Sequence, residues 1–134
     1  DGFRVLPGAQ LTHAFSPTVR ASLSVGMDIE RTQRAHLDRD GVSGEVRVAS
    51  DWRGGFSTSL FARYARDQYL GNYPGTGTPR LDDRLSAGVT VSNSRIDLGG
   101  FTPALTYSYT RQFSNVSFFD HDSHDVTFGL TKAF

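Results

Sequence analysis

The chain has 134 residues with 14 basic and 14 acidic side chains, so its formal net charge is zero. A neutral chain gives no reason to expect a nucleic-acid partner, and the lack of cysteine excludes disulfides and thiolate metal sites. Mean hydropathy is −0.36, and no run approaches the roughly 20 apolar residues of a membrane-spanning helix. Transmembrane β-barrels escape that test because only every second residue faces lipid.

The first two segments predict β-strands. Residues 3–15 are irregular because Pro7-Gly8 interrupts them, which predicts a strand with a bulge or bend. Residues 19–30 alternate without a mismatch. One face carries apolar side chains and the other carries polar or small ones, and this period of two is that of a strand rather than a helix.

The same alternation continues along the chain, over residues 42–52, 56–66, 84–93, 101–111 and 125–134. Phe61 is the one large ring on a polar face. Seven strands of about 10–12 residues are longer than most strands of soluble sheets and match tilted bilayer-spanning strands. The sequence therefore predicts an all-β, antiparallel up-and-down structure, with residues 1–134 forming one barrel portion.

The predicted connections differ in length. Residues 16–18 and 53–55 are tight turns and 93–100 is slightly longer, whereas 31–41, 66–83 and 112–124 are long and polar. Outer-membrane barrels have short periplasmic turns and long outer loops. The 66–83 loop is the longest, and its role stays open between a plain surface loop, a segment folded into the lumen and a client contact.

The two faces decide between a membrane barrel and a soluble lipocalin-like barrel, which share the alternating pattern. Aromatic residues predicted at membrane interfaces flank the apolar face: Phe15, Trp52, Phe56, Tyr64, Phe101, Tyr109 and Phe134. The centre of that face has no charge, so we expect it to meet lipid. The charged residues predicted to face the lumen are Arg20, Asp28, Glu30, Glu45, Arg47, Arg63 and Arg84. They either line a pathway or, as we favour, pair across strands and fill the interior.

The last strand ends on an aromatic residue. Its final eight residues resemble the C-terminal β-signal of bacterial outer-membrane proteins, in the residues Thr127, Gly129, Leu130 and Phe134, although Lys132 departs from the pattern. The resemblance implies recognition by the barrel-assembly machinery and a periplasmic C-terminus. Single-chain bacterial barrels have even strand numbers. Seven strands therefore predict that at least one more precedes Asp1, and that the upstream part is absent here.

A family resemblance is carried by the last thirty residues: Tyr107-x-Tyr109-Thr110-Arg111, then Ser114-Asn115, and the ending G-L-T-K-x-F. These features resemble the surface lipoprotein assembly modifier (Slam) family. The resemblance implies a periplasmic tetratricopeptide domain followed by an outer-membrane barrel of about fourteen strands. It also implies a role in moving lipoproteins or other proteins to the cell surface, with a lipoprotein as client.

Nothing in the chain predicts an enzyme or a cofactor. The run Asp120 to Asp125 contains His121 and His124, which are metal-ligand types, but neighbours on an extended loop diverge, so we expect a solvated loop and no metal site. His13 is the one imidazole predicted on a strand, and no nucleophile pairs with it. Two alternatives stay open: a passive porin or small structural barrel of eight strands, and a soluble lipocalin-like binder.

Overall fold

The computed structural model describes residues 2–132, whose strands form one antiparallel sheet in which each strand after the first pairs with the next one along the chain. No helix in this range is long and apolar enough to cross a membrane. Three short 3₁₀ turns occur, namely η1 (Ala35–Leu37), η2 (Arg53–Gly55) and η3 (Ser117–Phe119). The strands are β1 (Phe3–Val5), β2 (Gly8–Ser16), β3 (Val19–Arg31), β4 (Arg39–Asp51), β5 (Phe56–Asn72), β6 (Pro79–Asn93), β7 (Phe101–Ser114) and β8 (His121–Lys132). The predicted all-β, up-and-down architecture is confirmed.

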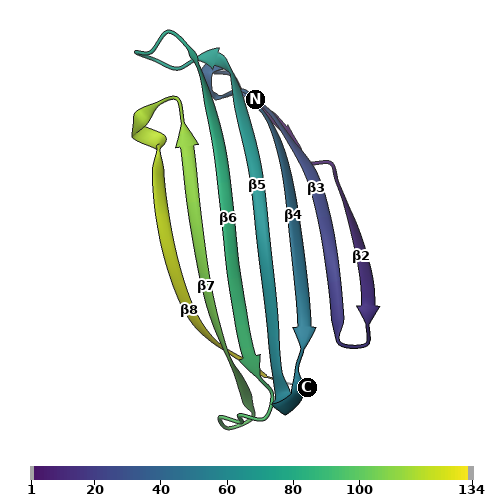
Figure 1. Ribbon diagram of the computed structural model, residues 1–134. Coiled ribbons are helices and arrows are strands. Elements are labelled where there is room, and N and C mark those ends of the chain that lie inside the picture. The colour runs from purple at the N-terminus through teal and green to yellow at the C-terminus, as the bar shows by residue number, and fades with distance from the viewer. Residues whose placement is uncertain (1, 133–134) are drawn as a thin grey trace.

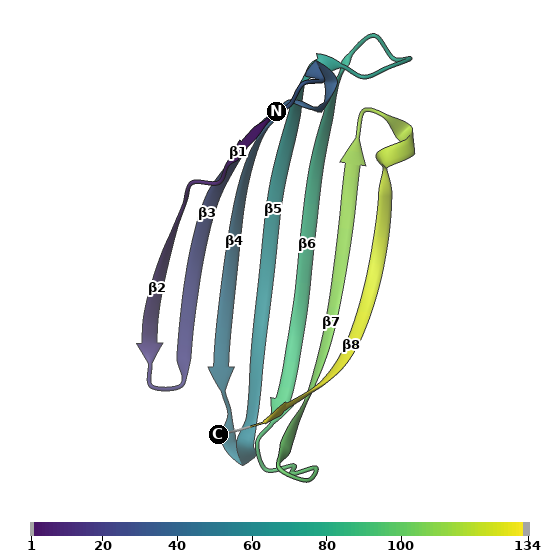
Figure 2. The same cartoon turned by 180° about the vertical axis from the view of Figure 1, so that it is seen from behind.

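The sheet is a single curved layer, with β2 and β8 at opposite edges (Figures 1 and 2). Strands β1 and β2 both pair with β3, so they occupy one strand position that is broken at Pro7. Proline has no backbone N–H to give to a ladder. Its carbonyl nevertheless accepts a bond of 2.9 Å from the Met27 amide, so β3 stays tied to the chain across the break.

The apolar face is exposed and does not form a core. Leu23, Val46 and Leu105 are 47%, 49% and 52% exposed, and within residues 2–132 Val116 is the one buried apolar side chain. Serines and threonines on the other face, which we call the polar face, are mostly half-buried on the central strands. Side chains crowd on the inside of a curved layer, so the polar face is the concave one. A lipocalin-like barrel needs the opposite arrangement.

Three strand pairs extend beyond the range in which hydrophobicity alternates. Residues 31–41, 66–83 and 112–124 were predicted as long loops, but the connections are 32–38, 73–78 and 115–120. Most of the predicted 66–83 loop is therefore strand. The reason is that charged residues pair across strands: Arg66 and Asp83 are register partners with a 3.4 Å ion pair. Pairing can continue where both faces are polar.

The opposite end of the sheet has the connections 17–18, 52–55 and 94–100. The last of these has seven residues, as many as 32–38. Connection length therefore does not alternate strictly between short and long, contrary to the prediction. We call this end of the sheet the turn end and the opposite end the loop end. The two ends differ in composition, because charged residues gather on both faces at the loop end.

Candidate functional site on the polar face

All seven charged residues predicted to face the lumen lie on the polar face. The strand register places them there: Glu30 is opposite Arg39, Ser22 is opposite Arg47, and Glu45 is opposite Arg63. Their placement on one face follows from the alternation alone, but their grouping does not. Asp28 and Glu30 belong to a paired cluster at the loop end, whereas the four arginines form a separate row with Glu45 beside them.

Arg39 is the centre of the loop-end cluster. Its guanidinium lies 2.7 Å from Asp28, 3.0 Å from Glu30 and 3.6 Å from Asp67, and its side chain is only 19% exposed. Arg4 on β1 donates two further hydrogen bonds to Asp28, of 2.8 and 2.6 Å. Cross-strand ion pairing of the predicted kind thus fills this part of the concave surface.

The sequence reasoning missed Arg4, Arg39 and Asp67. Arg39 and Asp67 fell in stretches predicted as loops, because apolar residues stop alternating there. A usable signal was present, because Asp28 and Glu30 continue the polar face at a spacing of two residues. Acidic residues at the end of one strand predict basic residues opposite them at the start of the next strand.

A second group at the loop end holds η3 against the sheet. Arg80 lies between two rings, 4.8 Å from the centroid of Tyr69 and 3.3 Å from that of Phe119, and its Nε donates to Asp82 at 3.0 Å. The buried Gln112 accepts a bond of 2.7 Å from Arg84 and donates one of 2.9 Å to the Phe119 carbonyl. These bonds fold the 115–120 connection over the polar face.

The η1 turn is folded in the same direction. A Cβ at Gly71 on β5 would overlap with the backbone of Ala35, so the glycine lets η1 lie directly on the strand. The Leu70 amide donates a bond of 2.9 Å to the Asp38 carbonyl. Two of the three connections at the loop end therefore narrow the concave space.

Four arginines form a row that crosses the sheet obliquely. Arg47 is opposite Ser22, Arg63 is opposite Glu45, and Arg84 is opposite Ala65. From β3 to β6, each arginine thus sits two residues nearer the loop end than the one on the preceding strand. Diagonal neighbours of this kind are about 7–8 Å apart. We call this set the arginine diagonal: Arg20, Arg47, Arg63 and Arg84.

The members of the arginine diagonal differ in their partners. Arg47 lies 3.2 Å from Glu45 and 5.2 Å from the centroid of Phe61, and Arg84 is bonded to Gln112. Within residues 2–132, neither Arg20 nor Arg63 has a hydrogen bond or an ion pair. All four are exposed, whereas most of their neighbours on this face are half-buried.

The aromatic residues predicted at membrane interfaces lie on the apolar face. Phe15, Trp52, Phe56 and Phe101 are at the turn end, where the Trp52 Nε1 donates to the Thr58 hydroxyl at 2.8 Å. Tyr64 and Tyr109 lie nearer the loop end, and Phe134 is outside the described residues. Whether any of these rings meets a membrane interface stays a prediction.

Charges on the apolar face concentrate at the loop end. Arg31 is 2.8 Å from Asp40, Arg66 is 3.4 Å from Asp83, and Arg111 is 2.7 Å from Asp120. The Tyr64 hydroxyl donates to Asp83. From Phe56 to Tyr64, eight residue steps of about 3.3 Å, tilted by 35–45°, give an uncharged band roughly 20 Å high, near the 25 Å or so of barrel proteins.

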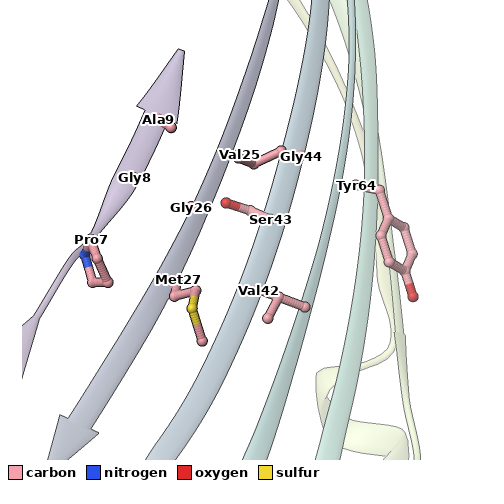
Figure 3. A pocket seen from close by; sticks show the side chains of 10 residues that line it. All are labelled: Pro7, Gly8, Ala9, Val25, Gly26, Met27, Val42, Ser43, Gly44 and Tyr64. Atoms are coloured by element: carbon pink, nitrogen blue, oxygen red, sulfur yellow. The ribbon is translucent and has the colours of Figure 1, made fainter.

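A shallow hollow of about 600 Å³ interrupts the apolar face beside the Pro7 break (Figure 3). Gly44 has no side chain there, so the row between Val25 and Tyr64 has a gap. Met27 and Val42 also line it, and the lining is mostly apolar. An apolar lining of this kind could accept an acyl chain, but the missing side chain at Gly44 is enough to account for the hollow.

The predicted β-signal residues lie on β8, at one edge of the sheet. Thr127 and Gly129 face the polar side, opposite Thr106 and Ala104, and Leu130 on the apolar face is 50% exposed. Phe134 lies outside the described residues. An edge strand presents unpaired backbone groups to a further strand, but recognition by an assembly factor stays a prediction.

The histidine-rich run was wrongly assigned to a loop, since β8 begins at His121. His124 is therefore a strand residue on the apolar face, and its Nδ1 lies 2.8 Å from the Tyr107 hydroxyl. His13 packs edge-on against Phe15 with centroids 4.6 Å apart. Within residues 2–132, no group of three His, Asp or Glu side chains is arranged to hold a metal ion.

Comparison with known proteins agrees with the family resemblance of the C-terminal strands. The sequence model of the surface lipoprotein assembly modifier family matches residues 8–134, nearly the whole chain. The chain belongs to this family. No solved structure gives a significant match.

Two curated relatives show how far the similarity extends. Surface lipoprotein assembly modifier 1 of Haemophilus influenzae is 27% identical over 111 residues, which cover 81% of this chain and 23% of the relative. Hemophilin secretion modulator of Acinetobacter baumannii is 32% identical over 89 residues, covering 65% of this chain and 18% of the relative. The chain thus spans about a quarter or less of the length of the relatives it matches.

Proposed function

We propose that these residues form part of an outer-membrane β-barrel that moves a lipoprotein or another protein to the bacterial cell surface. The observation that supports this proposal most strongly is the two-faced sheet: one face carries an exposed apolar band and the other, concave face carries the charges, in a chain of the surface lipoprotein assembly modifier family. The names of two relatives refer to lipoprotein assembly and to hemophilin secretion, which supports protein cargo.

The membrane assignment is supported by the energetics of the apolar face. Transfer of apolar surface from water into hydrocarbon is favourable by about 25 cal/mol per Å². Leu60 is 55% exposed and Phe128 is 63% exposed in a row of similar side chains. Contact with lipid removes such a face from water. The backbone polar groups need no water there, because they are hydrogen-bonded between strands.

A passive pore is the second candidate, favoured by the exposed arginines of the concave face. Its interior would be open and lined by residues that select small ions by charge. The folding of η1 and η3 over the polar face supports the first candidate, because these turns reduce the open cross-section at the loop end.

The test uses the full-length protein expressed in a Gram-negative host that has no family member. An epitope-tagged lipoprotein from the source bacterium is co-expressed, and antibody labels intact cells. Labelling that requires the full-length protein supports the proposal. If the lipoprotein is produced and acylated but labels only after lysis, for every lipoprotein of that bacterium, protein export is contradicted. Bilayer conductance without export then supports the passive pore.

A further inference from the structure

The arginine diagonal carries an excess of positive charge across the polar face, from Arg20 beside the 17–18 turn to Arg84 near the loop end. Four arginines lie there on β3 to β6 with one carboxylate, Glu45, among them, so the sum is +4 − 1 = +3. The loop-end cluster has the opposite sign, because Asp28, Glu30 and Asp67 exceed Arg4 and Arg39 by one charge. The concave face is thus electrically polarised although the chain is neutral.

Arg20 and Arg63 are available to a ligand. Neither has a partner within residues 2–132, and both are exposed on a face where neighbouring side chains are half-buried. The repulsion between neighbouring guanidinium groups is relieved when an anion lies along the row. A guanidinium offers a planar fork of donors that fits a carboxylate in a bidentate manner.

The spacing selects the shape of the ligand. Successive arginine positions are about 7–8 Å apart, so the row of four spans roughly 21–24 Å, more than one small anion can contact. In an extended polypeptide, side chains on one side recur about every 6.6 Å. Carboxylates at every second residue therefore match the diagonal step by step.

We propose that the arginine diagonal binds an extended acidic segment of a polypeptide inside the barrel. This inference rests on the proposed function, since it describes how the moving chain is held. Arg20 and Arg63 provide the unpaired guanidinium groups. Arg47 and Arg84 extend the row and exchange their bonds to Glu45 and Gln112 for bonds to the ligand.

The experiment uses full-length protein in vesicles of zwitterionic lipid, so that lipid headgroups add no net charge. The probe is a fluorescent 12-residue peptide of alternating Glu and Ser, and the matched peptide replaces Glu with Gln. Anisotropy measures binding to wild type, to the double variant Arg20→Gln/Arg63→Gln, and to the control Arg95→Gln. Arg95 is exposed in the 94–100 turn, away from the diagonal.

The proposal expects the Glu peptide to bind the double variant about three- to tenfold more weakly than wild type, and binding to Arg95→Gln to be unchanged. The Gln peptide should bind poorly to all three proteins. Equal binding of the Glu peptide to wild type and the double variant overturns the proposal. So does a change confined to small-ion selectivity in bilayers. If the double variant does not fold, the single variants and Arg20→Lys/Arg63→Lys replace it, with smaller losses expected.

Measuring both lipoprotein export and peptide binding distinguishes an error in the binding role from an error in the export role. If wild-type protein exports lipoprotein and the double variant binds the Glu peptide normally, only the binding role is contradicted. If wild type exports nothing while the double variant loses peptide binding, the export role is contradicted and the binding surface stands.

Discussion

The ring of Phe61 on β5 lies directly over Gly88 on β6, and these two residues are register partners. A Cβ at position 88 would overlap with the edge of the ring and lie 2.9 Å from the Tyr107 carbonyl oxygen. The glycine therefore makes room for the large ring that Phe61 places on the polar face. An aromatic ring that covers a glycine of the neighbouring strand also restores packing that the glycine lacks.

Substitution of Gly88 should destabilise the sheet because the ring has to move. Gly88→Ala is expected to cost about 1–3 kcal/mol, as overpacking does elsewhere. Gly44→Ala is the matched control, since a Cβ there comes no closer than 3.8 Å to the Ser24 carbonyl oxygen. The measurement is the denaturant midpoint of full-length protein in detergent. In the Phe61→Ala background the penalty of Gly88→Ala should shrink, and an unchanged penalty would contradict the explanation.

Arg39 should be the most sensitive of the charged residues at the loop end. Arg39→Gln leaves Asp28, Glu30 and Asp67 facing one another in a half-buried site, with an expected loss of about 1–3 kcal/mol. Arg4→Gln is the control, because Arg4 is 50% exposed and should matter less. Thermal unfolding of the full-length protein measures both. Adding Asp67→Asn to Arg39→Gln should recover part of the loss. Equal stability of Arg39→Gln and wild type would refute this account.

The faces of the strands could be predicted from the sequence, whereas their ends could not. Alternation fixes which face a side chain occupies, and each predicted lumen residue lies on the polar face. Strand ends depend on pairing between charged residues such as Arg39 and Asp67, which a hydrophobic pattern does not record. The arginine diagonal could not be predicted from the sequence either, because alternation gives the face of each residue but not the register between strands.

The Ser114-Asn115 motif, which carried part of the family resemblance, has a structural role. The Asn115 amide oxygen accepts a bond of 2.8 Å from the Leu81 amide, and its nitrogen donates one of 2.9 Å to the Pro79 carbonyl. The Ser114 hydroxyl accepts a bond of 3.1 Å from the Val116 amide. The two Asn115 bonds tie the start of the 115–120 connection to β6, and the Ser114 bond is local to the connection.

Asn115→Ala should therefore release this connection without unfolding the sheet. We expect faster protease cleavage within residues 115–120 in the full-length protein, with the denaturant midpoint lowered by only about 1 kcal/mol. Asn115→Asp tests the mechanism, because it keeps the acceptor for Leu81 and loses the donor to Pro79. Cleavage at the wild-type rate in both variants would show that the side chain does not hold the connection.

Adjacent residues on β5 provide the sharpest test of which face meets lipid. Ser59 is on the polar face and half-buried, while Leu60 is on the apolar face and 55% exposed. These 134 residues contain no cysteine, so a single Ser59→Cys or Leu60→Cys adds one labelling site to this region. In full-length protein in membranes, a water-soluble maleimide should label Ser59→Cys. A fluorophore at Leu60→Cys, attached in detergent before reconstitution, should be quenched by lipids that carry a spin label in their acyl chains.

The reverse result, with position 60 reached from water and position 59 quenched by lipid, would place the arginines outside and rule out a charged interior. If both positions were reached from water, the sheet would not lie in a membrane.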